Sequence, residues 1–137
     1  MGRVIREDKQ RLSELYTQIA NCIVGDLLPG WTHFCLCFAV DAAQCETILV
    51  YYSLDGGISY RDLADKPRKG VADAQTGCQD LFQLCRAAGD RWTQFCLCVN
   101  AKGEFRADHC YDTLGSFTPL HQQVWRGRYL KVGGGID

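Results

Sequence analysis

The chain has 137 residues, 47% of them hydrophobic and 23% charged, and its formal net charge at pH 7 is −1. That length fits one domain with one core, and the apolar content is typical of a globular chain rather than a disordered one. A charge this close to zero argues against nucleic-acid binding through a basic patch, and it lacks the strong acidity of a DNA mimic.

Hydropathy and the N-terminal segment bear on where the protein works. No segment approaches the run of about 18 apolar residues that predicts a membrane span. The N-terminal MGRVIREDKQ is charged and lacks the apolar core of a signal peptide. Arg6 also occupies the position at which a myristoylation signal has Ser or Thr. We therefore expect a soluble, cytoplasmic protein.

The chain contains nine cysteines, an odd number, and we see no export signal that would bring them into an oxidising compartment. A disulfide framework is therefore not expected. The nine are Cys22, Cys35, Cys37, Cys45, Cys78, Cys85, Cys96, Cys98 and Cys110.

The first half of the chain predicts one helix followed by three strands. Apolar residues at helical spacing predict a helix over 7–28, which Pro29-Gly30 would end. Short runs of aromatic and branched residues bounded by turn residues predict strands. These expected strands are Phe34–Val40, Cys45–Leu54 and Ile58–Leu63, with a hairpin turn at Asp55-Gly56-Gly57 and a loop over Ala64–Gly70.

The second half predicts a helix, two strands and a last helix. Val71–Ala88 has a helical apolar face, and Thr118 followed by Pro119 predicts the start of a helix that carries Val124, Trp125 and Tyr129. The expected strands are Phe95–Val99 and Glu104–Tyr111, joined by a turn over 100–103. The order α-β-β-β-α-β-β-α predicts the α+β class, with a mainly antiparallel sheet of about five strands packed by helices. We expect a single domain over residues 1–132 and a flexible tail over 133–137.

A seven-residue motif occurs twice. WTHFCLC spans Trp31–Cys37, and WTQFCLC spans Trp92–Cys98. Each copy follows a predicted helix, opens with a tryptophan and enters a predicted strand. Because the halves differ outside these seven residues, we do not interpret the repeat as a duplication.

The paired cysteines of the motif suggest a metal or disulfide site, but strand geometry disfavours both within one copy. Side chains two residues apart on a strand lie on one face, about 6.6 Å apart. A tetrahedral zinc site requires sulfur atoms about 3.8 Å apart, and a disulfide requires Cβ atoms about 3.8 Å apart. We therefore predict that Cys35, Cys37, Cys96 and Cys98 are small apolar residues on a sheet face where a helix comes close. Four thiols that converge from neighbouring strands on one zinc ion remain an alternative.

Catalytic motifs are not found in the sequence. We find no Gly-x-Ser-x-Gly, P-loop, dinucleotide-binding fingerprint or His-Glu-x-x-His. His109 directly precedes Cys110, so on a strand the two would point to opposite faces, which weakens the most obvious Cys–His pair. We expect a binding protein rather than an enzyme, with no catalytic residues, cofactor or metal.

Several motifs, read in order, resemble one family. In the first half, a helix with the pattern Tyr-x-x-Ile-Ala-x-x-Ile precedes a proline and a tryptophan, and tyrosine-rich strands follow. The second half has a helix, a strand that begins with tryptophan, and then Gly-x-Phe, Asp and Tyr. It closes with Trp and Tyr-Leu. The matching residues are Tyr16, Ile19, Ala20, Ile23, Pro29, Trp31, the stretch VYYSLDGGISY, Trp92, Gly103, Phe105, Asp108, Tyr111, Asp112, Trp125, Tyr129 and Leu130. Over roughly residues 9–131 the chain resembles the YezG-like immunity proteins, formerly a family of unknown function.

The resemblance implies an antitoxin of a bacterial polymorphic toxin system. Such a protein binds the C-terminal domain of its cognate toxin, often a nuclease, and blocks it by occluding the active site; no direct contact with nucleic acid or membrane is implied. The chain departs from the family in being unusually rich in cysteine and in being less acidic than members expected to cover a nuclease. The second departure leaves the toxin's chemistry open. Alternatives are a cysteine-based zinc or thiol redox protein and a general adaptor.

An interface for the toxin would use acidic and aromatic residues near the second and third strands, together with acids at the end of the fifth. Tyrosine is a frequent anchor at protein interfaces, and carboxylates orient a partner. The candidate partner-binding residues are Tyr52, Asp55, Tyr60, Asp62, Asp65, Asp108 and Asp112.

Overall fold

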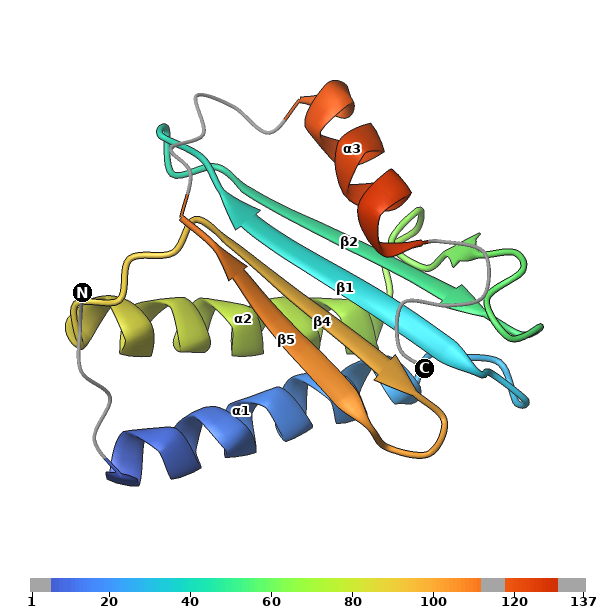
Figure 1. Cartoon of the computed structure of the whole chain (residues 1–137), viewed down its shortest axis with the longest axis horizontal. Coiled ribbons are helices and arrows are strands. Elements are labelled where there is room, and N and C mark those ends of the chain that lie inside the picture. The colour runs from blue at the N-terminus through green and yellow to red at the C-terminus, as the bar shows by residue number, and fades with distance from the viewer. Residues whose placement is uncertain (1–5, 112–117, 131–137) are drawn as a thin grey trace.

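The computed structural model describes residues 6–111 and 118–130 and confirms the α+β class and the predicted order of elements (Figure 1). The described part contains three helices and one five-stranded antiparallel sheet. The elements are α1 (Arg6–Val24), β1 (His33–Val40), β2 (Glu46–Ser53), β3 (Arg61–Asp62), α2 (Lys69–Ala87), β4 (Gln94–Asn100), β5 (Phe105–Cys110) and α3 (Pro119–Tyr129). The tail expected over 133–137 lies outside the described residues.

The strand order β3-β2-β1-β4-β5 places the two copies of the repeated motif side by side at the centre of the sheet. Leu36 of β1 lies opposite Leu97 of β4 in the antiparallel register. The motif is therefore the seam between the first three strands and the last two.

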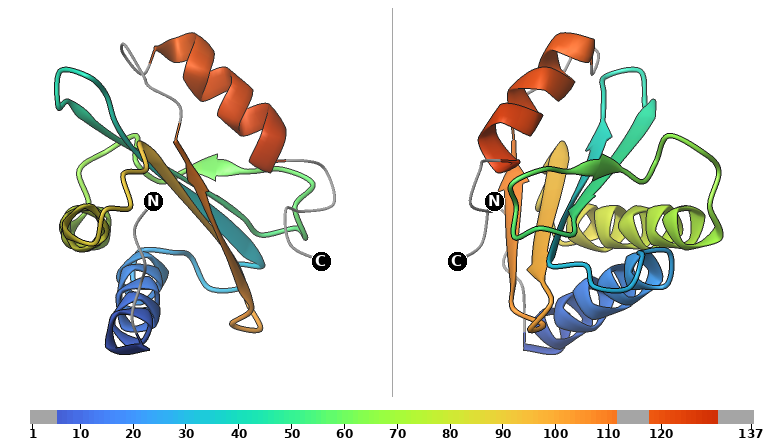
Figure 2. Two further views of the ribbon diagram at one scale, coloured as in Figure 1. Left: turned by 60° about the vertical axis from the view of Figure 1, so that its left-hand side comes forward. Right: turned by 90° about the vertical axis from the view of Figure 1, so that its right-hand side faces the viewer.

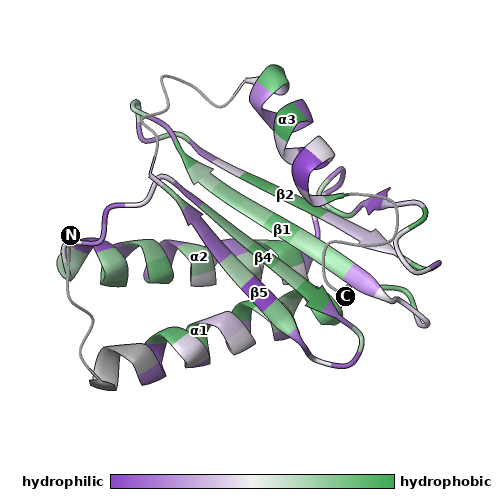
Figure 3. Cartoon of the chain, viewed as in Figure 1, coloured by the Kyte–Doolittle hydropathy of each residue, from purple (hydrophilic) through white to green (hydrophobic). Residues whose placement is uncertain are grey.

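The helices form layers on both faces of the sheet: α1 and α2 cover one face, and α3 crosses the other (Figure 2). The large side chains of β1 point toward the two-helix layer, where Phe34, Leu36 and Phe38 are buried in the main core. Figure 3 colours most of β1 and β4 hydrophobic, as expected for strands covered on both faces. No helix among residues 6–111 and 118–130 is long and apolar enough to cross a membrane.

α1 ends at Val24, before the predicted end at Leu28, and the residues that follow it contact α2. Gly25 follows, and the carboxylate of Asp26 accepts a hydrogen bond at 3.2 Å from the backbone N–H of Val71, in the first turn of α2. The first N–H groups of a helix have no partner within the helix. The end of α1 is therefore used to cap α2.

The predicted third strand over Ile58–Leu63 is wrong in extent, because β3 contains only Arg61 and Asp62. The residues before it form a turn held by side chains. The Ser53 hydroxyl accepts from the N–H of Gly57 at 2.9 Å, and the Asp55 carboxylate accepts from the N–H of Ser59 at 2.9 Å. Backbone groups that bond to side chains in this way cannot join the strand ladder.

The tryptophans that open the two motif copies differ in burial. Trp92 is buried among aromatic rings, with ring centroids 5.1 Å from Phe82 and 5.8 Å from Phe95. Trp31 is only half-buried, and its ring centroid lies 5.7 Å from that of Phe34. The repeat therefore gives equivalent strands but unequal anchors.

Two helical glycines provide a matched test of the packing between α1 and α2. A Cβ added to Gly77 of α2 would lie 2.8 Å from Cγ1 of the buried Ile19, whereas one added to Gly127 of α3 meets nothing within 4 Å. Gly127→Ala should raise the free energy of unfolding by up to about 1 kcal/mol through helix propensity. Gly77→Ala should lower it by roughly 1 kcal/mol or more, because overpacking exceeds the same gain. Denaturant titration followed by circular dichroism measures both, and stabilisation by Gly77→Ala would contradict the packing described.

Candidate functional site

The structure places the predicted partner-binding residues at opposite edges of the sheet. Asp62 lies in β3 at one edge, and Asp108 lies in β5 at the other. Tyr52 is buried in the core, so its side chain is not available on the surface; alternation along β2 turns it toward α1 and α2. Asp112 lies outside the described residues. The set therefore does not form one surface.

The acids near β3 make local bonds. The Asp55 carboxylate accepts from the hydroxyl of Ser59 at 2.6 Å and from that of Ser53 at 2.7 Å. These donors, Ser59 first, lower the pKa of Asp55 to about 2. Asp62 accepts from the N–H of Ala64 at 3.0 Å, and Asp65 lies 3.7 Å from the guanidinium of Arg68. Asp55 and Asp62 thus bond to the backbone of the turns on either side of β3, and Asp65 forms an exposed ion pair.

Tyr60 is half-buried rather than exposed. Its hydroxyl is buried, with no hydrogen-bond partner in the described part of the chain. Burial is the largest cause that raises its pKa to about 12, and the sulfurs of Cys35 and Cys98 add to it. The ring therefore packs toward the cysteine-bearing face of the sheet.

A cavity of about 260 Å³ lies at the opposite edge, between α3 and strands β4 and β5. We call it the α3 cavity. Cys96 of β4 and Asp108 of β5 line it from the sheet, while Leu120, Val124 and Trp125 line it from α3. The cavity combines two cysteines, Cys96 and Cys110, with a carboxylate and apolar side chains within one depression.

Hydrogen bonds fix α3 over this cavity. The Tyr129 hydroxyl donates to the Asp108 carboxylate at 3.1 Å, and Arg106 Nε lies 3.3 Å from the same carboxylate. The indole N–H of Trp125 donates to Cys96 Sγ at 2.9 Å. At the start of α3, Thr118 accepts from the N–H of His121, which confirms the predicted cap.

The four motif cysteines share the sheet face beneath α3. Cys35, Cys37, Cys96 and Cys98 are buried in a second core cluster with Leu49, Trp125 and Tyr129. The prediction that these cysteines pack where a helix comes close is confirmed. Among residues 6–111 and 118–130, no group of three or more His, Cys, Asp or Glu side chains is arranged to hold a metal ion.

The outer surface beside the cavity is apolar. Leu120 and Val124, one helical turn apart on α3, are 67% and 64% exposed. β5 is the last strand of the sheet, and its outer edge pairs with no described strand. Edge strands and exposed apolar side chains are features that binding surfaces use.

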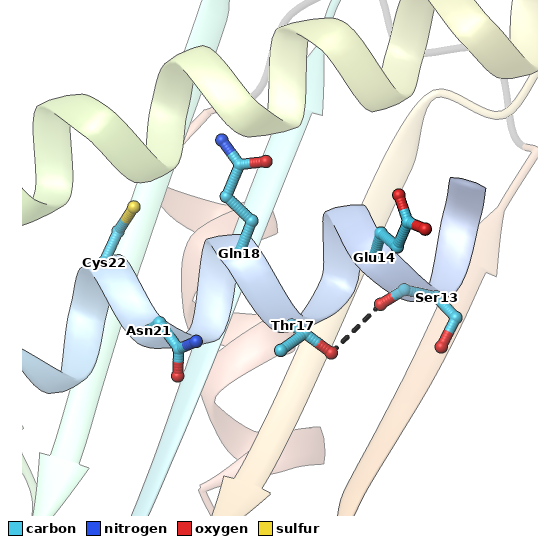
Figure 4. Close-up of a pocket in the computed structure, with 6 residues that line it drawn as sticks. All are labelled: Ser13, Glu14, Thr17, Gln18, Asn21 and Cys22. Atoms are coloured by element: carbon cyan, nitrogen blue, oxygen red, sulfur yellow. Dashed lines mark hydrogen bonds between the residues drawn. The ribbon is translucent and has the colours of Figure 1, made fainter. Parts of the chain in front are cut away.

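A second hollow lies along α1 and is lined by that helix alone (Figure 4). Its side chains are mostly polar, and Thr17 bonds back to the carbonyl of Ser13 at 3.0 Å. With no residue from a second element, the hollow places no chemical groups against one another.

Comparison with protein-family models and with curated proteins finds no match to this chain.

Two parts of this site were missed in the sequence. The sequence does indicate the Leu120–Val124 pair. The two large apolar residues are four apart and so share one side of the helix, which differs from the side of the buried Trp125. The opening of the cavity beside Cys96 has no local signal, because it depends on where α3 crosses the sheet.

The pKa of Asp55 predicts a pH-dependent contribution to stability. A carboxyl whose pKa is lowered on folding stabilises the fold above its unfolded pKa of about 3.9 and loses that contribution as pH falls toward 2. Asp55→Asn should therefore unfold at lower denaturant concentration than the wild type at pH 6, and the gap should close between about pH 4 and pH 2. Asp65→Asn controls for the lost charge, and a gap independent of pH would contradict the role assigned to Asp55.

Proposed function

We propose that the protein is a cytoplasmic immunity protein that binds and blocks the C-terminal domain of a cognate bacterial toxin by occluding its active site. The observation that carries this proposal is the mutual packing of the residues on which the family resemblance rests. Tyr16 of α1 meets Phe105 of β5 edge-on, with ring centroids 6.0 Å apart, and both are matched residues. Tyr16 also stacks on Phe95 of β4, which is not one of the matched residues, at 5.5 Å. Residues matched far apart in the sequence thus belong to one contact network.

The closing motifs belong to the same structural unit. Asp108 is the aspartate that follows the Gly-x-Phe motif, and Tyr129 belongs to the closing Tyr-Leu motif. The carboxylate of Asp108 accepts a hydrogen bond from the hydroxyl of Tyr129. Trp125 of that motif fills the second core cluster. This packing supports the resemblance as one of fold, and the family's function follows as the proposal.

The surface we assign to the toxin is the α3–β5 surface, formed by Leu120, Val124, Asp108 and the outer edge of β5. Exposed apolar side chains next to a carboxylate and a strand at the edge of the described sheet suit a protein partner. The β3 edge is less suited, because Asp55 and Asp62 bond to their own turns. Of the predicted interface residues, Asp108 alone lies on the α3–β5 surface among those described.

The proposal is tested by co-expressing the chain with the toxin domain encoded by the gene immediately upstream. Protection of the host and co-purification of the two proteins are expected. Unimpaired toxicity, with the chain present in folded form, would overturn the proposed function.

The assigned surface is tested by two matched charge insertions. Leu120→Glu on α3 and Ile58→Glu near β3 alter side chains of equal size with 67% and 69% exposure. If Leu120 is an interface anchor, Leu120→Glu should weaken toxin binding by about 2 kcal/mol, roughly 30-fold in Kd. Ile58→Glu should leave Kd within about threefold of the wild type. Titration calorimetry measures both, and the reverse ranking would place the interface at the β3 edge.

A further inference from the structure

The register of β1 and β4 places the four motif cysteines in two cross-strand pairs. Cys35 lies opposite Cys98, and Cys37 lies opposite Cys96. The positions of the ladder hydrogen bonds follow from two flanking bonds of 2.9 Å, from Val40 N–H to the Thr93 carbonyl and from Ala101 N–H to the Thr32 carbonyl. Because hydrogen-bonded and non-hydrogen-bonded pairs alternate in an antiparallel ladder, both cysteine pairs fall at non-hydrogen-bonded positions.

That position satisfies the spacing that a disulfide requires. Directly opposed residues at non-hydrogen-bonded positions have Cα atoms about 4.5 Å apart, their closest spacing in the ladder. A disulfide accepts Cα separations of about 4.4–6.8 Å. The same-strand pairing that strand geometry disfavours therefore gives way to a cross-strand pairing that needs little backbone movement.

The two pairs differ in access. Cys96 lines the α3 cavity, whereas Cys37, Cys35 and Cys98 do not. The sulfur of Cys96 accepts hydrogen bonds from Trp125 Nε1 at 2.9 Å and from Gln94 Nε2 at 3.5 Å. A small molecule that enters the cavity thus meets one of the four thiols.

Hydrogen bonding also separates Cys96 from its partner in acidity. Hydrogen bonding to the Cys96 sulfur lowers the pKa of Cys96 and outweighs the effect of burial. The bond with Cys37 has the largest effect, and those with Gln94 and Trp125 have smaller ones. Burial raises the pKa of Cys37 well above its ordinary value. Since the thiolate is the nucleophile, Cys96 is the member of the pair suited to react first.

We propose that Cys96 is a thiol that hydroperoxides oxidise through the α3 cavity, and that Cys37 then converts the oxidised Cys96 into a cross-strand disulfide. The Cys96 thiolate attacks one oxygen of hydrogen peroxide: an S–O bond forms, the O–O bond breaks, and the departing hydroxide takes up the proton that the Cys96 thiol had released and leaves as water. Cys96 is then a sulfenic acid. The Cys37 sulfur attacks the Cys96 sulfur, so that the S–S bond forms, the S–O bond breaks, and the hydroxide leaves with the Cys37 proton as a second water.

This modification site does not depend on the proposed antitoxin function. The disulfide would join the two central strands of the sheet and alter the sulfur to which Trp125 donates. Cys35 and Cys98 have the same cross-strand geometry but no described cavity reaches them, which makes them an internal control.

The test uses two triple variants of the full chain that each remove one cross-strand pair. Both carry Cys45→Ser, because Cys45 is the exposed cysteine and would form intermolecular disulfides. One variant adds Cys35→Ser and Cys98→Ser, and the other adds Cys37→Ser and Cys96→Ser. The folded proteins are treated with hydrogen peroxide, the remaining thiols are alkylated after denaturation, and linked peptides are identified by tandem mass spectrometry.

We expect the variant that retains Cys37 and Cys96 to form the β1–β4 disulfide on the order of tenfold faster than the variant that retains Cys35 and Cys98. Equal rates, or a faster Cys35–Cys98 link, would overturn the proposal. If either variant fails to fold, fragmentation of the linked peptide from the single Cys45→Ser protein decides. A Cys37–Cys96 bond supports the proposal, whereas another pairing or no disulfide refutes it.

Discussion

The antiparallel pairing of β1 with β4 joins the two halves of the chain, and every other layer is built on it. Each strand contributes one copy of the Phe-Cys-Leu-Cys stretch, and Leu36 faces Leu97 at the centre of the register. Both strands are buried on both faces, so alternate positions must suit two different environments. Large residues point toward α1 and α2, and the cysteines point toward α3.

The choice of cysteine follows from the shape of the α3 layer. A single helix must cover four strand positions, and it does so with two large aromatic side chains, Trp125 and Tyr129. Small residues beneath these rings let the helix approach the sheet, while a thiol can still accept the indole N–H of Trp125. A close-packed interior leaves little room for larger side chains at these positions. The repeated motif therefore supplies small residues beneath α3, and it also places thiols opposite one another on β1 and β4.

The proposed functional surface and the proposed thiol site meet at α3. The helix is held by the hydrogen bonds from Tyr129 to Asp108 and from Trp125 to Cys96. It leaves Leu120 and Val124 exposed beside β5, whose outer edge pairs with no described strand. Asp108 is predicted as an interface acid, and the structure shows it as the acceptor that holds Tyr129 of α3. The same side chains thus support the fold and shape the surface.

Local chemistry in the sequence by itself determined the elements and their order. Helical periodicity, the Thr118-Pro119 start of α3 and the short aromatic and branched run of β1 are read within a few residues of each position. The hydrogen bond from Val71 to Asp26, beyond the end of α1, was not readable, because it joins residues far apart in the chain. Nor was the burial of Tyr52 or the cross-strand pairing of Cys37 with Cys96, because strand neighbours and register are set by contacts between segments far apart in the chain. Only the tertiary structure decided which motif cysteines face one another and which of those four borders the α3 cavity.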